Sequence, residues 1–316
     1  MSLLKLFATI RTDALTLVAL LLALLNKEIF LLCALGVICW CHSKKMALKL
    51  MVAYVVAGPL TDIIKVVFHI EAPWIRDRSF SPAQPSADFM LKYNFPPATF
   101  LRTLVAGYAF PASGFFGFST LAATVFVTKR RVMVKLLSVL AVLLVSSSIF
   151  YLGLRTPWSV LASLIIAATA AALADSFIEG TLFDKKQNLL YGALLMLPSF
   201  ILLCTAVPLF FNDKITLDGL YDVIGRIGLY LGIITGWFVE SMYINFSPRC
   251  DRRRMQVSKA LLGIIYMLSV YFILGFVFSL IPGFRMGAFI RNYLTAGVAF
   301  AAYPAYIKSK YSSIIN

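Results

Sequence analysis

Residues 146–162 read Ser-Ser-Ser-Ile-Phe-Tyr-Leu-Gly-Leu-Arg-Thr-Pro-Trp-Ser-Val-Leu-Ala and join two long apolar runs, with Arg155 at the junction. The first run covers residues 132–153 and the second covers residues 157–173. A membrane-spanning helix needs about 17–25 predominantly apolar residues. The two runs therefore predict a pair of spans that are joined by a short turn at the membrane surface.

The composition of the whole chain extends this interpretation. Of the 316 residues, 60% are hydrophobic and only 14% are charged, whereas soluble domains have roughly 25% charged residues. Apolar runs cover most of the sequence and leave no long polar segment, so we expect one integral-membrane domain over residues 1–316. Residues 1–25 continue into the first spans without a small-residue cleavage site, so we expect the start of the chain to be retained.

The expected fold is an all-α, polytopic membrane helical bundle of about eight to nine spans. Residues 1–27 contain Lys5, Arg11 and Asp13, and they predict an interfacial helix that is followed by a span at 29–41; two short spans are the alternative. The eight clearer runs cover residues 46–70, 112–128, 132–153, 157–173, 189–211, 220–243, 257–281 and 288–307.

The charges of the connecting loops predict the orientation in a cell membrane. Basic residues gather in alternate short loops, and such loops face the cytoplasm by the positive-inside rule. The segments 71–110, 212–218 and 282–291 and the turn at Arg155 would then face outward. The net charge of +15 is explained by this topology, so we expect no nucleic-acid partner. The sixteen basic residues are Lys44, Lys45, Lys49, Lys129, Arg130, Arg131, Lys135, Lys185, Lys186, Arg249, Arg252, Arg253, Arg254, Lys259, Lys308 and Lys310.

Two features of the late spans favour packing. Gly228, Gly232 and Gly236 recur at every fourth residue and predict a groove where another helix approaches closely. Glu240 is interpreted as an interfacial charge, because a proton relay would need a partner that the sequence does not identify.

Metal and cofactor chemistry have little support in the sequence. The cysteines lie in apolar runs or in a basic loop and are interpreted as small, mostly buried residues. His42 and His69, the two histidines, have no companions with metal-ligand spacing, so we expect neither a metal nor a cofactor. The five cysteines are Cys33, Cys39, Cys41, Cys204 and Cys250.

Three short blocks follow one another along the chain. The first is Lys65-Val-Val-Phe-His-Ile-Glu-Ala72-Pro73, the second is Tyr108-Ala-Phe-Pro-Ala-Ser-Gly-Phe-Phe116, and the third is the opening stretch. Together they resemble the type 2 phosphatidic acid phosphatase superfamily of lipid phosphatases and haloperoxidases. Its blocks read Lys-x6-Arg-Pro, Tyr-x-Phe-Pro-Ser-Gly-His and Ser-Arg-x-Tyr-Leu-Gly-x-His-x-Pro-x-Asp-Val-Leu.

The resemblance extends over nearly the whole chain. It implies a phosphatase-like core at 46–175 and additional C-terminal spans at 189–307. Similarity at Gly228-Leu-Tyr-Leu-Gly232 and at Tyr243-x-Asn245-Phe246 belongs to the second part. The run Pro73-Trp74-x-x-Asp77 is similar to bacterial members of the superfamily.

The family's catalytic groups are missing from the matching positions. Arg155 stands at the place of the nucleophilic histidine, Ser159 at the place of the aspartate that orients it, and Phe115 at the place of the histidine that protonates the leaving group. Arginine stays protonated and has no free lone pair, so it cannot replace the nucleophile. Whether the chain is an enzyme stays open at this point, and a pseudophosphatase is favoured.

A phosphate-binding set nevertheless remains. The resemblance implies that Lys65, Arg76, Ser113, Arg155 and the amide of Gly114 lie around the position of the phosphate. The alternative is that Arg155 pairs with Asp77 or Asp88 at a wet helix junction and Lys65 snorkels outward.

His69 is a weak catalytic candidate. It is four residues after Lys65 and could share a helix face with it. An interfacial histidine at the end of a span is the simpler interpretation.

Three functions are compatible with these residues. The favoured one is a catalytically degenerate lipid-phosphatase-like protein that binds membrane lipids, in particular a lipid phosphate or polyprenyl phosphate headgroup on the outer face, or acts as a non-catalytic subunit of a membrane-protein partner. The second is an active membrane phosphatase for lipid phosphates or polyprenyl diphosphates. The third is a structural or transport component that has retained no site.

Overall fold

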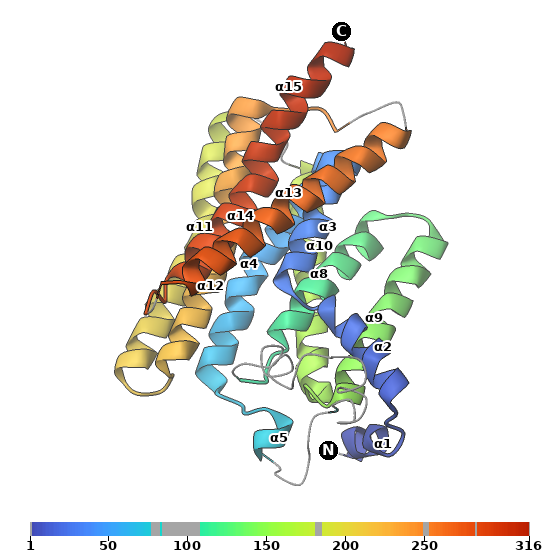
Figure 1. Ribbon diagram of the computed structural model, residues 1–316, viewed down its shortest axis with the longest axis vertical. Coiled ribbons are helices and arrows are strands. Elements are labelled where there is room, and N and C mark those ends of the chain that lie inside the picture. Colours follow the sequence, from blue (N-terminus) through green and yellow to red (C-terminus); the bar gives the residue numbers. More distant parts are fainter. Residues whose placement is uncertain are drawn as a thin grey trace. The chain divides into compact units, whose positions relative to one another are not determined.

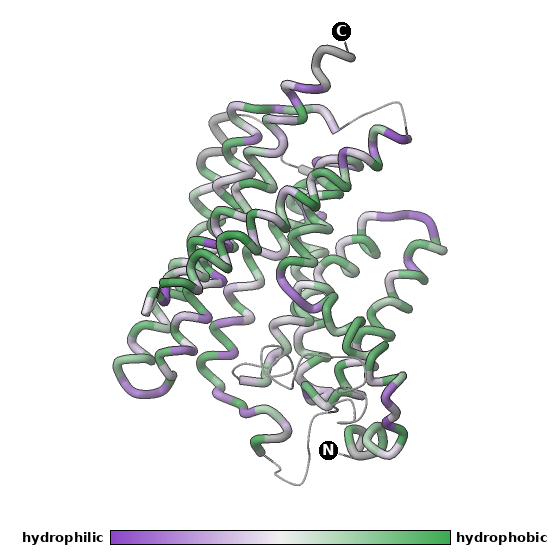
Figure 2. Tube along the Cα trace, viewed as in Figure 1, coloured by the Kyte–Doolittle hydropathy of each residue, from purple (hydrophilic) through white to green (hydrophobic). Residues whose placement is uncertain are grey.

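The structure is a computed structural model that describes residues 2–76, 83, 108–180, 185–248, 253–281 and 283–315 (Figure 1). Every regular element within these ranges is helical, which confirms the all-α prediction. Two compact units are present: residues 1–30 with 61–169, and residues 31–60 with 170–316. Hydrophilic residues lie mostly near the ends of the long helices, and apolar residues follow their bodies (Figure 2).

Six of the described helices are long and apolar enough to cross a membrane. The number rises to seven if two N-terminal helical segments, Asp13–Leu24 and Glu28–His42, count as one broken span. The chain is therefore a multi-pass membrane protein. The six are α4 (Lys44–Phe68), α9 (Val132–Leu152), α10 (Pro157–Gly180), α11 (Lys185–Phe211), α12 (Leu217–Val239), which continues as the π-helix η2 (Glu240–Ile244), and α13 (Arg253–Ser279).

Among the described residues, six to seven helices qualify as spans where eight to nine were predicted, and two runs account for most of the difference. Residues 112–128 form α8 (Ser113–Thr128), whose 16 residues fall short of the usual spanning length. Residues 288–307 form α14 (Gly287–Gly297), the π-helix η3 (Val298–Ala302) and the start of α15 (Tyr303–Ile315). Arg291 and Asn292 lie in that C-terminal run, which is not among the six apolar helices.

The N-terminal segment is divided more finely than the sequence suggested. It forms α1 (Ser2–Thr9), α2 (Asp13–Leu24), α3 (Glu28–Val37) and the π-helix η1 (Ile38–His42). Thr12 caps α2, because its hydroxyl accepts a hydrogen bond from the Leu15 amide. The single interfacial helix that was expected within residues 1–27 is thus interrupted between α1 and α2.

The first unit is built on α9, against which α1, α2 and α8 pack. Its hydrophobic core includes Phe115, Phe118, Ile149 and Leu152. The Tyr151 hydroxyl accepts a hydrogen bond of 2.9 Å from the Thr12 amide, which joins the start of α2 to the end of α9. This packing fixes the end of α9 and the start of α8, which carry the candidate site.

The second unit contains the glycine-lined contact that the sequence predicted. A methyl group added at Gly228 or Gly232 of α12 would lie 2.5 Å from a backbone oxygen of α14, that of Phe289 or Tyr293 respectively. The Asn292 amide nitrogen donates a hydrogen bond of 2.9 Å to the Gly225 oxygen in the same contact. The packing role of this stripe is confirmed.

Glu240 has the partner that the sequence could not identify. Its carboxylate lies 2.6 Å from the Lys44 ammonium and accepts a hydrogen bond of 3.2 Å from the Phe246 amide. Lys49 and Asp175 form a second ion pair, of 2.5 Å, in this unit. Both contacts connect helices that are far apart in the sequence, so these charges stabilise the fold of the unit.

Candidate functional site

The candidate site lies in the first unit, where three segments meet. These are the end of α4, the start of α8 and the turn between α9 and α10. The Lys65 ammonium of α4 lies 3.5 Å from the hydroxyl of Ser113, which is the first residue of α8. Lys65 is buried, with 5% of its surface exposed. The structure thus brings together two of the predicted phosphate-binding residues from positions 48 residues apart.

The start of α8 offers backbone donors beside this lysine. The first amides of a helix have no partner inside the helix, and its N-terminus carries a partial positive charge. Ala112 is the N-cap residue, and no side chain among the described residues caps the helix there. An anion at this point would meet the helix terminus and the lysine together.

Gly114 has a packing role at the same helix start. A methyl group added to it would lie 3.2 Å from the Asn26 oxygen, in the turn between α2 and α3. This distance is tighter than most contacts of a real Cβ atom. Glycine therefore lets this turn approach α8.

Arg155 and Ser159 both hold the segment before α8. The Arg155 guanidinium donates a hydrogen bond of 2.6 Å to the Tyr108 oxygen, and the Ser159 hydroxyl donates to the Ala109 oxygen. In return, the Ala112 amide donates a hydrogen bond of 3.3 Å to the Ser159 oxygen. These bonds fix residues 108–112 against the α9–α10 turn. The two side chains that the resemblance aligned with catalytic residues thus bind backbone oxygens here.

The turn that presents Arg155 has a simple local cause. Gly153 ends α9 in the left-handed conformation, at φ 72°. The Gly153 and Leu154 amides donate to the Phe150 and Ile149 oxygens, each at 3.0 Å, which closes the helix end. Arg155 follows directly and is buried, with 9% of its surface exposed.

His69 lies outside the helix that carries Lys65. The expectation that both project from one helix face was wrong, because α4 ends at Phe68 and His69 has a positive φ of 50°. The His69 Nδ1 atom lies 2.8 Å from the Val67 oxygen. A carbonyl only accepts, so Nδ1 carries the proton and Nε2 has the lone pair of the neutral ring.

Tyr108 links the histidine to the arginine, a connection that the sequence analysis missed. Its ring meets the His69 ring edge-on with the centroids 4.8 Å apart, while its backbone oxygen accepts the hydrogen bond from Arg155. Burial, and next the negative charge of Glu71, raise the pKa of the Tyr108 phenol. The phenol therefore stays protonated at neutral pH.

Asp62 is a second residue that the sequence analysis missed. Only 1% of its surface is exposed, and it precedes Lys65 by three positions on α4. Residues three apart are neighbours on a helix surface. The sequence could have indicated Asp62 as a site candidate, because it is an acidic residue within the apolar run 46–70.

Phe115 belongs to the hydrophobic core of the unit, with 2% of its surface exposed. The neighbouring Phe116 is buried to the same extent. A phenyl ring has no proton to donate, so Phe115 contributes packing to this region.

Some predicted partners lie outside what the structure describes. The backbone of Arg76 ends the short helix α5 (Pro73–Arg76), but its side chain is outside the described part. Asp77 and Asp88, the proposed alternative partners of Arg155, are also outside it. Among the described residues no three His, Cys, Asp or Glu side chains are grouped as metal ligands.

Comparison with known proteins identifies one part of the chain. Residues 224–310 match the family model described as PAP2 superfamily phosphatase, transmembrane extension. Neither the curated proteins nor the solved structures gave a match. The matched region runs from α12 into α15 and includes residues 228–232 and 243–246, where the sequence resemblance was noted. Lys65, Ser113 and Arg155 precede it, so their roles stay predictions.

Proposed function

We propose that this multi-pass membrane protein, whose residues 224–310 form a PAP2 superfamily transmembrane extension, binds the phosphate of an anionic lipid or polyprenyl phosphate without hydrolysing it. The observation that supports the proposal is the convergence of the Lys65 ammonium and the N-terminus of α8, joined through Ser113 at 3.5 Å. By the charge of the loops, this end of the first unit faces outward.

The chemistry of this convergence suits a phosphate. A phosphate oxygen accepts hydrogen bonds, and helix N-termini are recurrent phosphate sites because their amides and dipole favour negative charge. Lys65 adds a full positive charge, and burial strengthens its attraction for an anion relative to water. Ser113 supplies a hydroxyl at the same point. The Arg155 guanidinium donates to the Tyr108 oxygen, in the segment before α8, and its planar fork suits the oxygens of a phosphate.

Three residues aligned with catalytic residues of lipid phosphatases cannot perform the corresponding chemistry, so we expect no turnover. Arg155 cannot attack phosphorus, because its guanidinium has no available lone pair. Ser159 donates its hydroxyl to a backbone oxygen, and Phe115 is packed in the core. A nucleophile and the group that orients it act as a unit, so losing both removes the catalytic advantage of each. Lipid partners and any partner protein stay predictions.

Replacement of Lys65 by glutamine tests the binding proposal. Hydrogen bonds to charged groups contribute about 1.5–3 kcal/mol, so Lys65→Gln is expected to weaken retention of phosphatidic acid or undecaprenyl phosphate by about 10- to 100-fold. The measurement is mass spectrometry of the intact, detergent-solubilised protein during lipid titration. Lys214→Gln is the matched control, since it removes an exposed lysine from the other unit. Unchanged retention in a folded Lys65→Gln protein would contradict the proposal.

A second candidate function, phosphate-ester hydrolysis, is supported by the geometry of His69. The contact of Nδ1 with the Val67 oxygen fixes the tautomer and leaves the lone pair on Nε2, which is the form a nucleophilic imidazole needs. The Nε2 atom is buried and has no hydrogen-bond partner among the described residues. A backbone carbonyl would then orient the ring where the superfamily uses aspartate.

Release of inorganic phosphate separates the two functions. We expect no release above a protein-free blank from phosphatidic acid, undecaprenyl phosphate or undecaprenyl diphosphate, because the superfamily's nucleophile position holds arginine. Release that His69→Ala abolishes and His42→Ala preserves would establish the second function and overturn the first. Circular dichroism would show that both variants remain folded.

A further inference from the structure

The most exposed apolar helix of the second unit is α13. Its spanning part, Arg254–Ser279, has only 11% of its most apolar window buried inside the described structure. Large apolar side chains therefore point outward along most of its length, and in a membrane they contact lipid. Arg254 begins this spanning part and is itself exposed.

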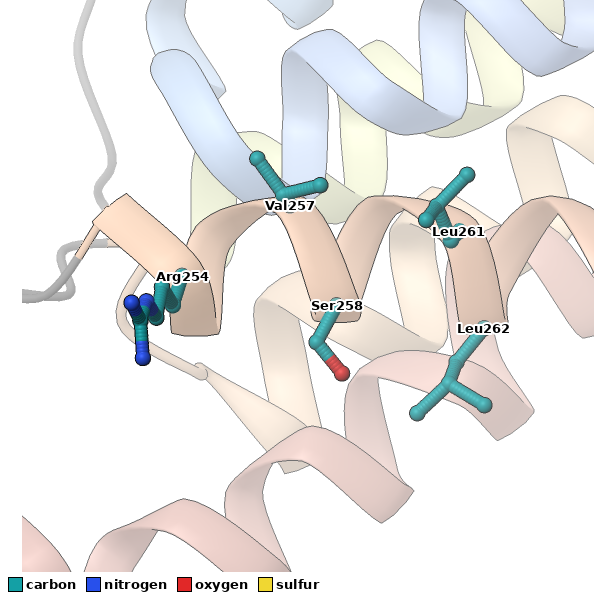
Figure 3. A pocket seen from close by; sticks show the side chains of 5 residues that line it. All are labelled: Arg254, Val257, Ser258, Leu261 and Leu262. Atoms are coloured by element: carbon teal, nitrogen blue, oxygen red, sulfur yellow. The ribbon is translucent and has the colours of Figure 1, made fainter.

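An open groove follows the first turns of this helix (Figure 3). Its volume is about 580 Å³, and it is lined by Arg254, Val257, Ser258, Leu261 and Leu262. In Figure 3, Arg254, Ser258 and Leu262 point to one side of α13, and Val257 and Leu261 point to the other. One end of the groove thus carries a cation and a hydroxyl, and the remainder is apolar.

The length of the groove matches one leaflet of a bilayer. The eight steps from residue 254 to 262 of a helix rise about 12 Å at about 1.5 Å per residue. Half of a hydrocarbon core of about 30 Å is about 15 Å. A lipid whose headgroup lies at Arg254 would therefore place most of one acyl chain against Val257, Leu261 and Leu262.

The charge of this end selects the headgroup. No ion pair of the Arg254 side chain is present within the described ranges, and the residue belongs to a basic loop that the charge pattern assigns to the cytoplasmic side. Anionic lipids give the cytoplasmic leaflet a negative surface potential, which attracts arginine near the membrane surface. Positive charge at the head and apolar surface below it are complementary to an anionic phospholipid.

We propose that this groove binds an anionic glycerophospholipid of the cytoplasmic leaflet. Its phosphate pairs with Arg254, an ester oxygen accepts a hydrogen bond from Ser258, and an acyl chain follows the apolar side chains toward Leu262. The site is independent of the Lys65 site, because it lies in the other unit and at helix ends of opposite predicted orientation.

Titration with two lipids of identical acyl chains tests the site. The full-length protein in detergent is titrated with phosphatidylglycerol and with phosphatidylcholine, and bound lipid is counted by mass spectrometry of the intact protein. One arginine near a membrane surface is worth about a fivefold preference for the anionic lipid. We expect Arg254→Gln to abolish that preference, and Arg130→Gln, which removes an exposed loop cation from the other unit, to preserve it.

Two further variants keep the result unambiguous. Ser258→Trp fills the exposed groove and is expected to lower the binding of both lipids. The titrations are repeated in the Lys65→Gln background, so that any phosphatidylglycerol held at the Lys65 site does not mask the loss of preference at Arg254. A folded Arg254→Gln protein that still prefers phosphatidylglycerol would overturn the proposal. Disulfide crosslinking of Leu261→Cys between two copies in lipid vesicles would also overturn it, because a second copy would then cover the groove.

Discussion

Gly228→Ala is expected to reduce the stability of the second unit by about 3 kcal/mol, near the upper end of the usual cost of overpacking. The added methyl group would lie 2.5 Å from the Phe289 oxygen and 3.0 Å from its carbonyl carbon. These are backbone atoms of α14, so no side-chain rotation relieves the clash and the two helices must separate. The measurement is the apparent melting temperature of the detergent-solubilised protein.

Two other helical glycines provide matched controls for this substitution. A methyl group at Gly297 meets nothing within 4 Å, and one at Gly275 meets the Arg291 side chain at an ordinary 3.6 Å. Alanine is the better helix former by about 1 kcal/mol, so Gly297→Ala and Gly275→Ala are expected to be neutral or slightly stabilising. Equal melting temperatures for Gly228→Ala and these controls would show that the α12–α14 contact is not a close one.

Ser159→Asp is expected to destabilise the first unit by several kcal/mol, although the resemblance to lipid phosphatases aligns this position with an aspartate. Ser159 is fully buried, and its hydroxyl donates to the Ala109 oxygen. An ionised aspartate cannot donate, so it would place negative charge against that oxygen at a fully buried position, which costs several kcal/mol. Thermal unfolding at pH 7 measures the effect.

Ser159→Asn is the control for shape, since its amide can still donate to the Ala109 oxygen. We expect the asparagine variant to be more stable than the aspartate variant at pH 7. Burial raises the pKa of a carboxyl above its unfolded value, so the folded aspartate protein binds a proton more readily and the difference should shrink as the pH falls. Equal stability of both variants at every pH would contradict this interpretation of Ser159.

This expectation also bears on attempts to restore catalysis. Arg155→His together with Ser159→Asp returns two residues of the superfamily motif, but it removes both side chains that hold residues 108–112. A loss of the fold of this segment is then expected before any gain of activity. Restoration would require a new hydrogen bond for the Tyr108 and Ala109 oxygens as well.

The helices were predictable because their signal is local. Runs of apolar residues with basic residues at alternate ends predicted α4, α9, α11 and α13 to within a few residues. The glycine spacing on α12 predicted close packing because a repeat of four places small residues on one helix face. The number of spans was less predictable, since an apolar run such as α8 can be too short to cross a membrane.

The contacts within the candidate site were less predictable, because they join segments that are far apart in the sequence. The resemblance to lipid phosphatases implied that Lys65 and Ser113 meet, and the structure places them 3.5 Å apart. Sequence gave no sign that Arg155 and Ser159 would bind the backbone of residues 108–109, because these bonds join segments about 50 residues apart. His69 lies outside α4 and has a positive φ. The rule that residues four apart share a helix face applies only while the helix continues, and the sequence did not show where α4 ends.

The sequence by itself determined that this is a membrane protein, where most of its helices lie and which loops are basic. Each of these depends on the apolar length or the charge of one segment, and not on contacts between segments. The tertiary structure decided which polar side chains face one another: Lys65 with Ser113, Glu240 with Lys44, and Arg155 with the Tyr108 oxygen. The physical reason is that a buried polar group must find a partner wherever the packing of distant segments brings one. That choice depends on the whole fold of each unit.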